Sequence, residues 1–192
     1  RRERGIRAYG SHPAMIVVFD SNVWLAELGL RSGAAAATEF FLNHSGSRLA
    51  LPEVVRLEVQ NNLESRLAEH IGAIQTSYRQ LLTAFGTLRE VVLPTPDEVH
   101  AKVQELFDSV QVPKIDVPFS LTSARSSFLK TIAKVPPSDK TQEFKDGVLW
   151  ADCVALLSQE PVALVTSDKA FYQDRTYERG LAANLRDEVA AV

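Results

Sequence analysis

Cysteine is almost absent from this chain of 192 residues, because Cys153 is the only one. A single thiol cannot form an internal disulfide, and it cannot build a zinc site of clustered thiolates. These two exclusions favour a reducing compartment, and we expect a cytoplasmic protein. We interpret Cys153 itself as a core residue.

Long hydrophobic runs are missing too. The longest apolar runs, residues 15–19 and 161–165, are far shorter than the ~18 residues that a membrane-spanning helix needs. No signal-like apolar segment follows the basic start. We therefore expect neither secretion nor a membrane partner.

The composition, 45% hydrophobic and 23% charged, fits one globular domain with a substantial core. Residues 1–14 differ from the rest: they carry four Arg and one Glu, lack apolar periodicity and precede the only methionine, Met15. We interpret residues 1–14 as an added leader or a native basic arm, and residues 15–192 as a single domain. Subtracting the leader's charges from 21 basic and 24 acidic residues leaves 17 and 23, a net charge of −6. This balance disfavours a broad phosphate-binding face.

Strand-like and helix-like segments alternate along the chain. Short apolar runs predict strands at residues 15–20, 48–51, 89–93 and 162–165. Helical spacing and capping residues predict helices at residues 23–30, 34–43, 53–85, 96–110 and 144–159, the third either continuous or broken near Gly72. We interpret residues 110–142 as a helical or loop insertion, with a loop at 111–119 and a weak helix at 121–133. The alternation predicts an α/β fold in three layers, a central mostly parallel sheet between two layers of helices.

Two of the predicted strands end in a carboxylate. Asp20 follows the first strand and Asp168 follows the last. Parallel sheets bind ligands beyond the carboxyl ends of their strands, so both acids are expected at that edge. Either residue alone is equally consistent with a cap of the following helix.

Two further acids lie on predicted helices. Asp146 stands at the start of the 144–159 helix, where a carboxylate is also favoured by the helix dipole. Glu58 lies in an otherwise apolar helical segment, with Glu53 and Glu64 as competing choices on the same helix. Several converging carboxylates are typical of sites that hold Mg²⁺ or Mn²⁺ for phosphodiester hydrolysis. Without a cation, such acids repel one another.

Four segments that carry these acids resemble, in order and spacing, the motifs of PIN-domain nucleases. They are MIVVFDSNVW, LPEVVRLEVQNNLESRL, PPSDKTQEFKDGVLWADCVALL and ALVTSDKAF, and together they span Met15 to about Phe171. The chain looks most like the larger PIN-like subgroup in which an EFKD-type segment opens the helix of the third acid.

The resemblance implies a three-layer PIN-like fold and a Mg²⁺- or Mn²⁺-dependent endoribonuclease that prefers single-stranded RNA. It implies Asp20, Glu58, Asp146 and Asp168 as catalytic residues and metal ligands. The expected supporting or substrate-binding residues are Asn22, Ser167, Lys145 and Lys169. The implied reaction is in-line attack of a metal-activated water on phosphorus.

The chain departs from the family pattern after Asp168, where Lys169, Ala170 and Phe171 supply no second acid. This leaves open whether one or two metal ions bind. Four basic residues of the 110–142 segment are further candidates for phosphate contact: Arg125, Lys130, Lys134 and Lys140.

Other functions find less support in the residues. No Gly-rich nucleotide loop and no GxSxG element is present, and position 22 is Asn where a phosphoaspartyl phosphatase needs Asp. Two alternatives stay open. One is an inactive PIN-like module that binds RNA or a protein; the other is a toxin ribonuclease held by a protein inhibitor or antitoxin. The resemblance also implies a homodimer.

Overall fold

The protein has a central parallel sheet. The computed structural model describes residues 14–27 and 32–192. The leader interpretation of residues 1–14 therefore falls almost wholly outside the described residues. The sheet order is β3-β2-β1-β4, with β1 (Ile16–Phe19), β2 (Arg48–Pro52), β3 (Lys114–Val117) and β4 (Val162–Val165) all parallel. Val17 of β1 aligns with Leu49 of β2 and Ala163 of β4. The predicted α/β class with a parallel sheet is confirmed.

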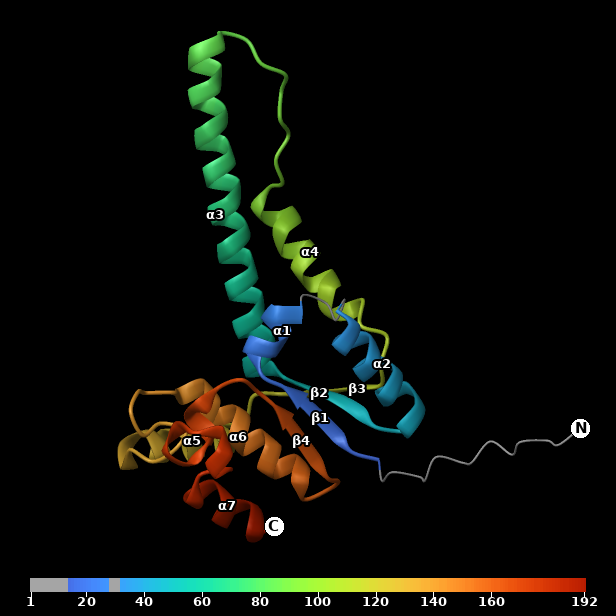
Figure 1. Cartoon of the computed structure of the whole chain (residues 1–192), viewed down its shortest axis with the longest axis vertical. Coiled ribbons are helices and arrows are strands. Elements are labelled where there is room, and N and C mark those ends of the chain that lie inside the picture. The colour runs from blue at the N-terminus through green and yellow to red at the C-terminus, as the bar shows by residue number, and fades with distance from the viewer. Residues whose placement is uncertain (1–13, 28–31) are drawn as a thin grey trace, which may run out of the picture.

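Helices cover both faces of this sheet (Figure 1). In the described ranges they are α1 (Ser21–Glu27), α2 (Gly33–Ser45), α3 (Glu53–Phe85), α4 (Pro96–Asp108), α5 (Leu121–Ala133), α6 (Phe144–Leu157) and α7 (Ala183–Ala190). Three short 3-10 turns, Lys169–Phe171, Gln173–Arg175 and Tyr177–Arg179, connect β4 to α7. None of the described helices is both long and apolar enough to cross a lipid bilayer.

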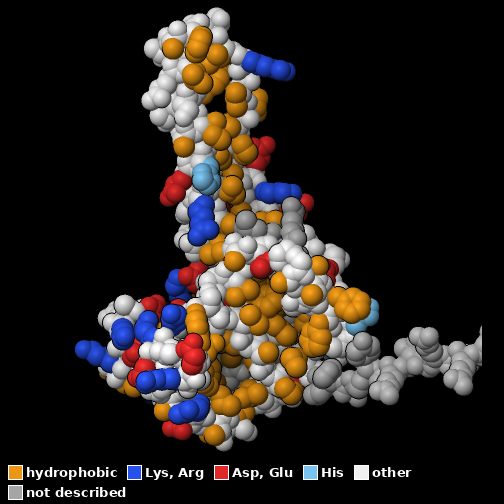
Figure 2. All heavy atoms as spheres, in the orientation of Figure 1, with side chains coloured by type: hydrophobic (Ala, Val, Ile, Leu, Met, Phe, Trp, Pro, Cys, Tyr) orange, Lys and Arg blue, Asp and Glu red, His pale blue; other side chains and the backbone are white. Residues whose placement is uncertain are grey.

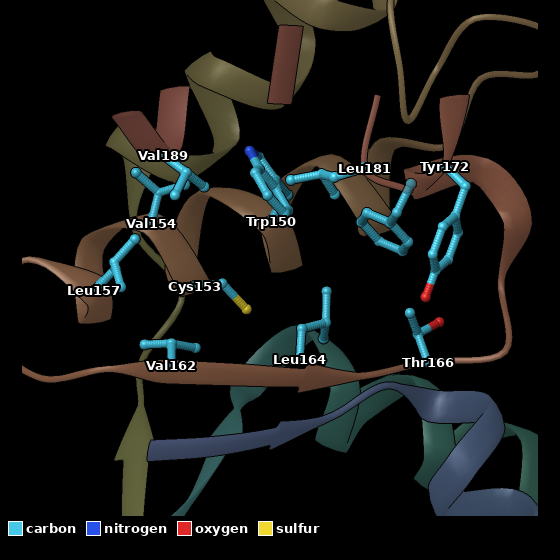
Figure 3. A pocket seen from close by; sticks show the side chains of 11 residues that line it. Trp150, Cys153, Val154, Leu157, Val162, Leu164, Thr166, Tyr172, Leu181 and Val189 are labelled. Atoms are coloured by element: carbon cyan, nitrogen blue, oxygen red, sulfur yellow. The ribbon is translucent and has the colours of Figure 1, made fainter. Parts of the chain in front are cut away.

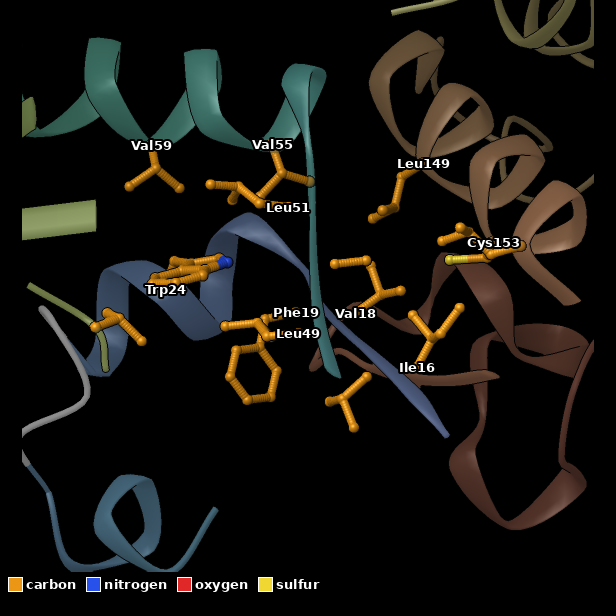
Figure 4. Packing of buried hydrophobic residues seen from close by; sticks show 14 of the residues in the cluster. Ile16, Val18, Phe19, Trp24, Leu49, Leu51, Val55, Val59, Leu149 and Cys153 are labelled. Carbon is orange, nitrogen blue, oxygen red and sulfur yellow. The ribbon is translucent and has the colours of Figure 1, made fainter. Parts of the chain in front are cut away.

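The core fills the space on either side of β1, whose four residues are all buried. Ile16 and Val18 point toward Leu149 and Cys153 of α6 (Figure 4). Phe19 lies on the side of α1 instead, and its ring meets Trp24 edge-on with centroids 5.9 Å apart. The interpretation of Cys153 as a core residue is confirmed, because it is buried and unpaired.

Two strand predictions were wrong, for opposite reasons. Residues 89–93 form no strand: Val91 and Val92 are exposed on a segment that returns from the tip of α3, away from the sheet. Residues 111–119, predicted as a loop, contain β3. Pro113 and Pro118 flank this strand rather than interrupt it, which an edge strand tolerates.

The packing of α5 on α6 fixes the first turn of α6. Ser127 of α5 donates a hydrogen bond of 2.6 Å from its hydroxyl to the carbonyl oxygen of Phe144. Gly147 allows this approach, because a Cβ atom there would lie 2.8 Å from the Cβ of Ser127. The close contact sets the position from which Asp146 projects.

The predicted 53–85 helix is a single helix, and its two halves have different surroundings. The first half packs on β2 and α1, and buries Val55, Val59 and Leu63. The second half leaves the domain, and the chain returns through an extended segment and α4 (Figure 1). We call residues 64–108 the arm.

Candidate active site

Asp20 is fixed at the carboxyl end of β1 by a set of hydrogen bonds. Its buried carboxylate accepts from the backbone amide of Ser21 (2.6 Å), from Asn22 Nδ2 (2.7 Å) and from Thr166 Oγ1 (2.6 Å). These donors come from α1 and from the end of β4. The carboxylate therefore has a defined orientation at the edge where β1 and β4 end.

Burial raises the pKa of Asp20 above its ordinary value. The hydrogen bonds from Thr166 and Ser21 oppose this shift, since they favour the charged form. The neighbouring carboxylates of Asp168 and Glu58 add to the rise in pKa. Both acids therefore lie near enough to repel Asp20.

Asp168 has two roles at the end of β4. Its Oδ1 accepts a hydrogen bond of 2.7 Å from the amide of Ala170 and so caps the first 3-10 turn. Its own amide donates to Thr166 Oγ1 at 2.9 Å. Asp168 is thus a cap, as its position after a strand suggested. It also belongs to the acidic cluster, because the cap uses only one of its two carboxylate oxygens.

Asp146 lies in the first turn of α6 and is the most perturbed acid of the group. Its pKa is raised to about 7, first by burial and then by repulsion from four other carboxylates, those of Asp168, Asp20, Glu143 and Glu58. A carboxyl group with this pKa is half protonated at neutral pH. Burial and the neighbouring carboxylates therefore both disfavour the charged form of Asp146 when no counter-ion is bound.

Glu58 of α3 forms an ion pair with Lys145, which donates from Nζ to Oε1. The competing acids on α3 have other partners. Glu53 accepts a 2.8 Å hydrogen bond from the amide of Phe119, and Glu64 meets His100 of α4 at 2.8 Å. Of the three, Glu58 alone is among the carboxylates that raise the pKa of Asp20 and Asp146.

The remaining expected residues lie around this cluster. Asn22 links both sides of the site, because it donates to Asp20 and accepts a 3.3 Å hydrogen bond from the amide of Ser167. The carbonyl oxygen of Ser167 accepts from the Tyr177 hydroxyl at 2.6 Å. The ammonium of Lys169 lies 5.3 Å above the ring of Tyr177.

The structure adds Thr166 and Glu143, which the sequence interpretation did not select. Thr166 holds Asp20 and accepts from the amide of Asp168, and the threonine two residues before the β4 acid was a readable signal. Glu143 raises the pKa of Asp146 and belongs to the same EFKD segment. Lys130, one of the candidates for phosphate contact, is instead buried and paired with Glu188 at 3.0 Å.

The donor set fits a hard divalent cation, which prefers carboxylate and other oxygen ligands. Such a cation would offset the repulsion between Asp146 and its neighbouring carboxylates, which helps to raise the pKa of Asp146 to about 7. Within residues 14–27 and 32–192, no three acidic, His or Cys side chains are already arranged closely enough to hold an ion.

An apolar cavity of about 360 Å³ lies beside the acids, between β4 and α6 (Figure 3). Trp150, Cys153 and Leu164 are among its lining residues, and no charged side chain lines it. Thr166, at one end, connects it to the acidic site through its hydrogen bond to Asp20. The cavity is therefore a neighbour of the cation site and not the site itself.

Fold and site together define a class: an α/β protein with acidic residues gathered where the parallel strands end. The model of the PIN-domain family matches residues 17–171, which is most of the chain. The chain therefore belongs to the PIN-domain family, whose members are generally nucleases that use divalent metals. No curated protein and no solved structure matches the chain significantly.

Proposed function

We propose that this PIN-domain protein is a Mg²⁺- or Mn²⁺-dependent endoribonuclease that cuts single-stranded RNA. The observation that carries the proposal is the gathering of Asp20, Glu58, Asp146 and Asp168 at the carboxyl edge of the sheet, where burial and then the neighbouring carboxylates raise the pKa of Asp20 and Asp146. A carboxyl group in a cluster of acids, with a pKa raised to about 7 by burial and by its charged neighbours, is typical of functional sites.

These four acids would hold the cation. When bound, it lowers the pKa of a water molecule and offsets charge that develops on the scissile phosphate. Asn22 and Thr166 orient the carboxylate of Asp20, so this ligand is already positioned before a cation arrives. Such partners of a ligand typically contribute about 10- to 100-fold to metal affinity or activity.

Two lysines supply positive charge beside the acids. Lys145 pairs with Glu58, and its exposed ammonium can also attract the phosphate of an approaching RNA. Lys169 follows the β4 acid directly and is exposed. Because the chain outside its first 14 residues has a net charge of −6, phosphate attraction must be concentrated at such local groups.

The test is cleavage of a fluorescent single-stranded RNA by the purified chain in Mn²⁺, in Mg²⁺ and in chelator, beside a DNA strand of the same sequence. Asp20→Asn should abolish cleavage, because it replaces a fixed anionic ligand with a neutral group of the same size. The matched control is Asp116→Asn, an exposed carboxylate on β3, which should cut like the wild type.

The other outcomes separate the alternatives. Metal-dependent thermal stabilisation without RNA cleavage would refute the ribonuclease proposal and keep the cation site. RNA binding that needs neither cation nor Asp20 would favour the inactive binding module. Cleavage that stops on addition of a co-purified small protein would identify a toxin and its antitoxin. The proposed setting remains the cytoplasm, on the ground that the chain has a single buried thiol.

A further inference from the structure

The arm exposes large hydrophobic side chains far from the acidic site. Hydrophobic side chains run along the face of the arm that Figure 2 shows. We call five of them the apolar arm face: Leu67, Ile74, Leu81, Phe85 and Val92, with exposed fractions of 38%, 47%, 51%, 70% and 88%. Exposure of this extent along one face of the arm indicates an interaction surface.

The spacing of apolar residues on α3 identifies the kind of partner. Leu67, Ile71, Ile74, Tyr78, Leu81 and Phe85 follow one another at intervals of 4, 3, 4, 3 and 4 residues. This is the 3.5-residue repeat of helices that pack side by side along a common seam. The stripe runs ~27 Å, at 1.5 Å per residue, so the partner is an elongated element such as another helix.

The chain itself covers only one side of the stripe. The extended segment after α3 crosses beside Tyr78, whose hydroxyl donates to the carbonyl oxygen of Arg89 at 3.3 Å. The end of the same segment and the start of α4 border a groove of about 590 Å³ on α3, which is lined by Leu67, Ile74 and Val92 among others. The groove and the most exposed side chain of the face, Val92, are thus adjacent.

The flanks of the stripe carry no charge that would select a partner of opposite sign. In the heptad that the spacing defines, the flanking positions are His70, Ser77 and Ala84 on one side and Ala68, Gln75 and Leu82 on the other. A nucleic acid would require Lys or Arg there. Two copies of the same neutral flank can meet without like-charge repulsion.

The area of the face also suits a pair of identical arms. The five exposed fractions equal about three fully exposed large side chains, on the order of 600 Å² in total at ~200 Å² for each. A standard interface takes ~800 Å² from each partner, of which ~60% is apolar, so it needs ~500 Å² of apolar area per side. One arm supplies that amount.

We propose that the arm is a homodimerisation element, in which the apolar arm faces of two chains pack against each other about a two-fold axis. In such an interface every contact occurs twice, with the two chains exchanged. Val92 of each chain therefore enters the groove of the other chain. The proposal does not depend on nuclease activity, because none of the acids lies on the apolar arm face.

The test is sedimentation equilibrium of the full chain over a wide concentration range. The wild type should form a reversible dimer, with twice the mass of one 21.2 kDa chain. A charged side chain buried between the two apolar arm faces should separate the two chains. The double variant Ile74→Asp, Leu81→Asp should therefore sediment as a monomer. Circular dichroism should show unchanged helix content in this variant, since both side chains are exposed in the single chain.

The control is Ile132→Asp on α5, where Ile132 is 62% exposed and belongs to a different apolar surface. This variant should remain a dimer. A wild-type monomer at every concentration would overturn the proposal, and so would a dimer that survives the arm substitutions. Dissociation by Ile132→Asp alone would assign the interface to α5 instead.

Discussion

Replacing Asp146 with Asn should stabilise the metal-free protein at alkaline pH. In the folded chain the pKa of this carboxyl is about 7, whereas its ordinary value is 3.8. Well below pH 3.8 the group is protonated in both the folded and the unfolded states, so it costs little. Between pH 4 and 7 its ionisation increasingly favours the unfolded state, and above pH 7 the whole penalty applies.

The magnitude follows from the size of the shift. A difference of ~3 pKa units corresponds to about 4 kcal/mol, which is an upper limit, since 1.36 kcal/mol applies to each unit. Solvent reaches part of the Asp146 side chain and relaxation reduces the repulsion, so we expect a gain of about 2 kcal/mol at pH 8. For a chain of this length that gain raises Tm by ~4–8 °C.

The assay is urea unfolding followed by circular dichroism at several pH values from 4 to 8, in the presence of chelator. The gain from Asp146→Asn should shrink as the pH falls toward 4. Asp116→Asn serves as the control, and its free energy of unfolding should stay within about 0.5 kcal/mol of the wild type at each pH, as expected for an exposed side chain.

Two results would refute the reasoning. A variant that is no more stable than the wild type at pH 8 would show that burial and the neighbouring acids do not penalise the charged form of Asp146 in the folded chain. A gain of equal size at pH 4 and pH 8 would assign the effect to packing rather than to charge. Adding Mn²⁺ supplies a second readout: it should stabilise the wild type and have a much smaller effect on the variant.

Gly147→Ala should lower the free energy of unfolding by about 1–3 kcal/mol in the same urea assay, because its Cβ atom would overlap α5. Gly72 lies in the middle of α3, where an added Cβ meets open space, so Gly72→Ala should instead raise the free energy of unfolding by ~0.5–1 kcal/mol. Equal effects of the two substitutions would contradict the packing of α5 on α6. Thr166→Val should weaken Mn²⁺ binding, measured by calorimetry, by about 10- to 100-fold, because Asp20 loses a 2.6 Å hydrogen bond. Unchanged affinity would remove Thr166 from the site.

The sequence by itself determined the elements whose local pattern is strong. The apolar runs before Asp20 and Asp168 predicted β1 and β4, because strands of parallel sheets consist of such runs, and each acid follows the end of its strand. The start of α6, and with it Asp146, was also readable. Order along the chain was therefore enough to nominate three of the four acids.

The tertiary structure decided what depends on distant parts of the chain. Residues 89–93 and 114–117 both have apolar side chains, but only the second segment lies beside β2 and becomes a strand. Helical periodicity could not separate Glu58 from Glu53 and Glu64, since all three lie on α3. Their partners Lys145, Phe119 and His100 made that distinction, because electrostatic and hydrogen-bond interactions follow distance in space and not separation along the chain.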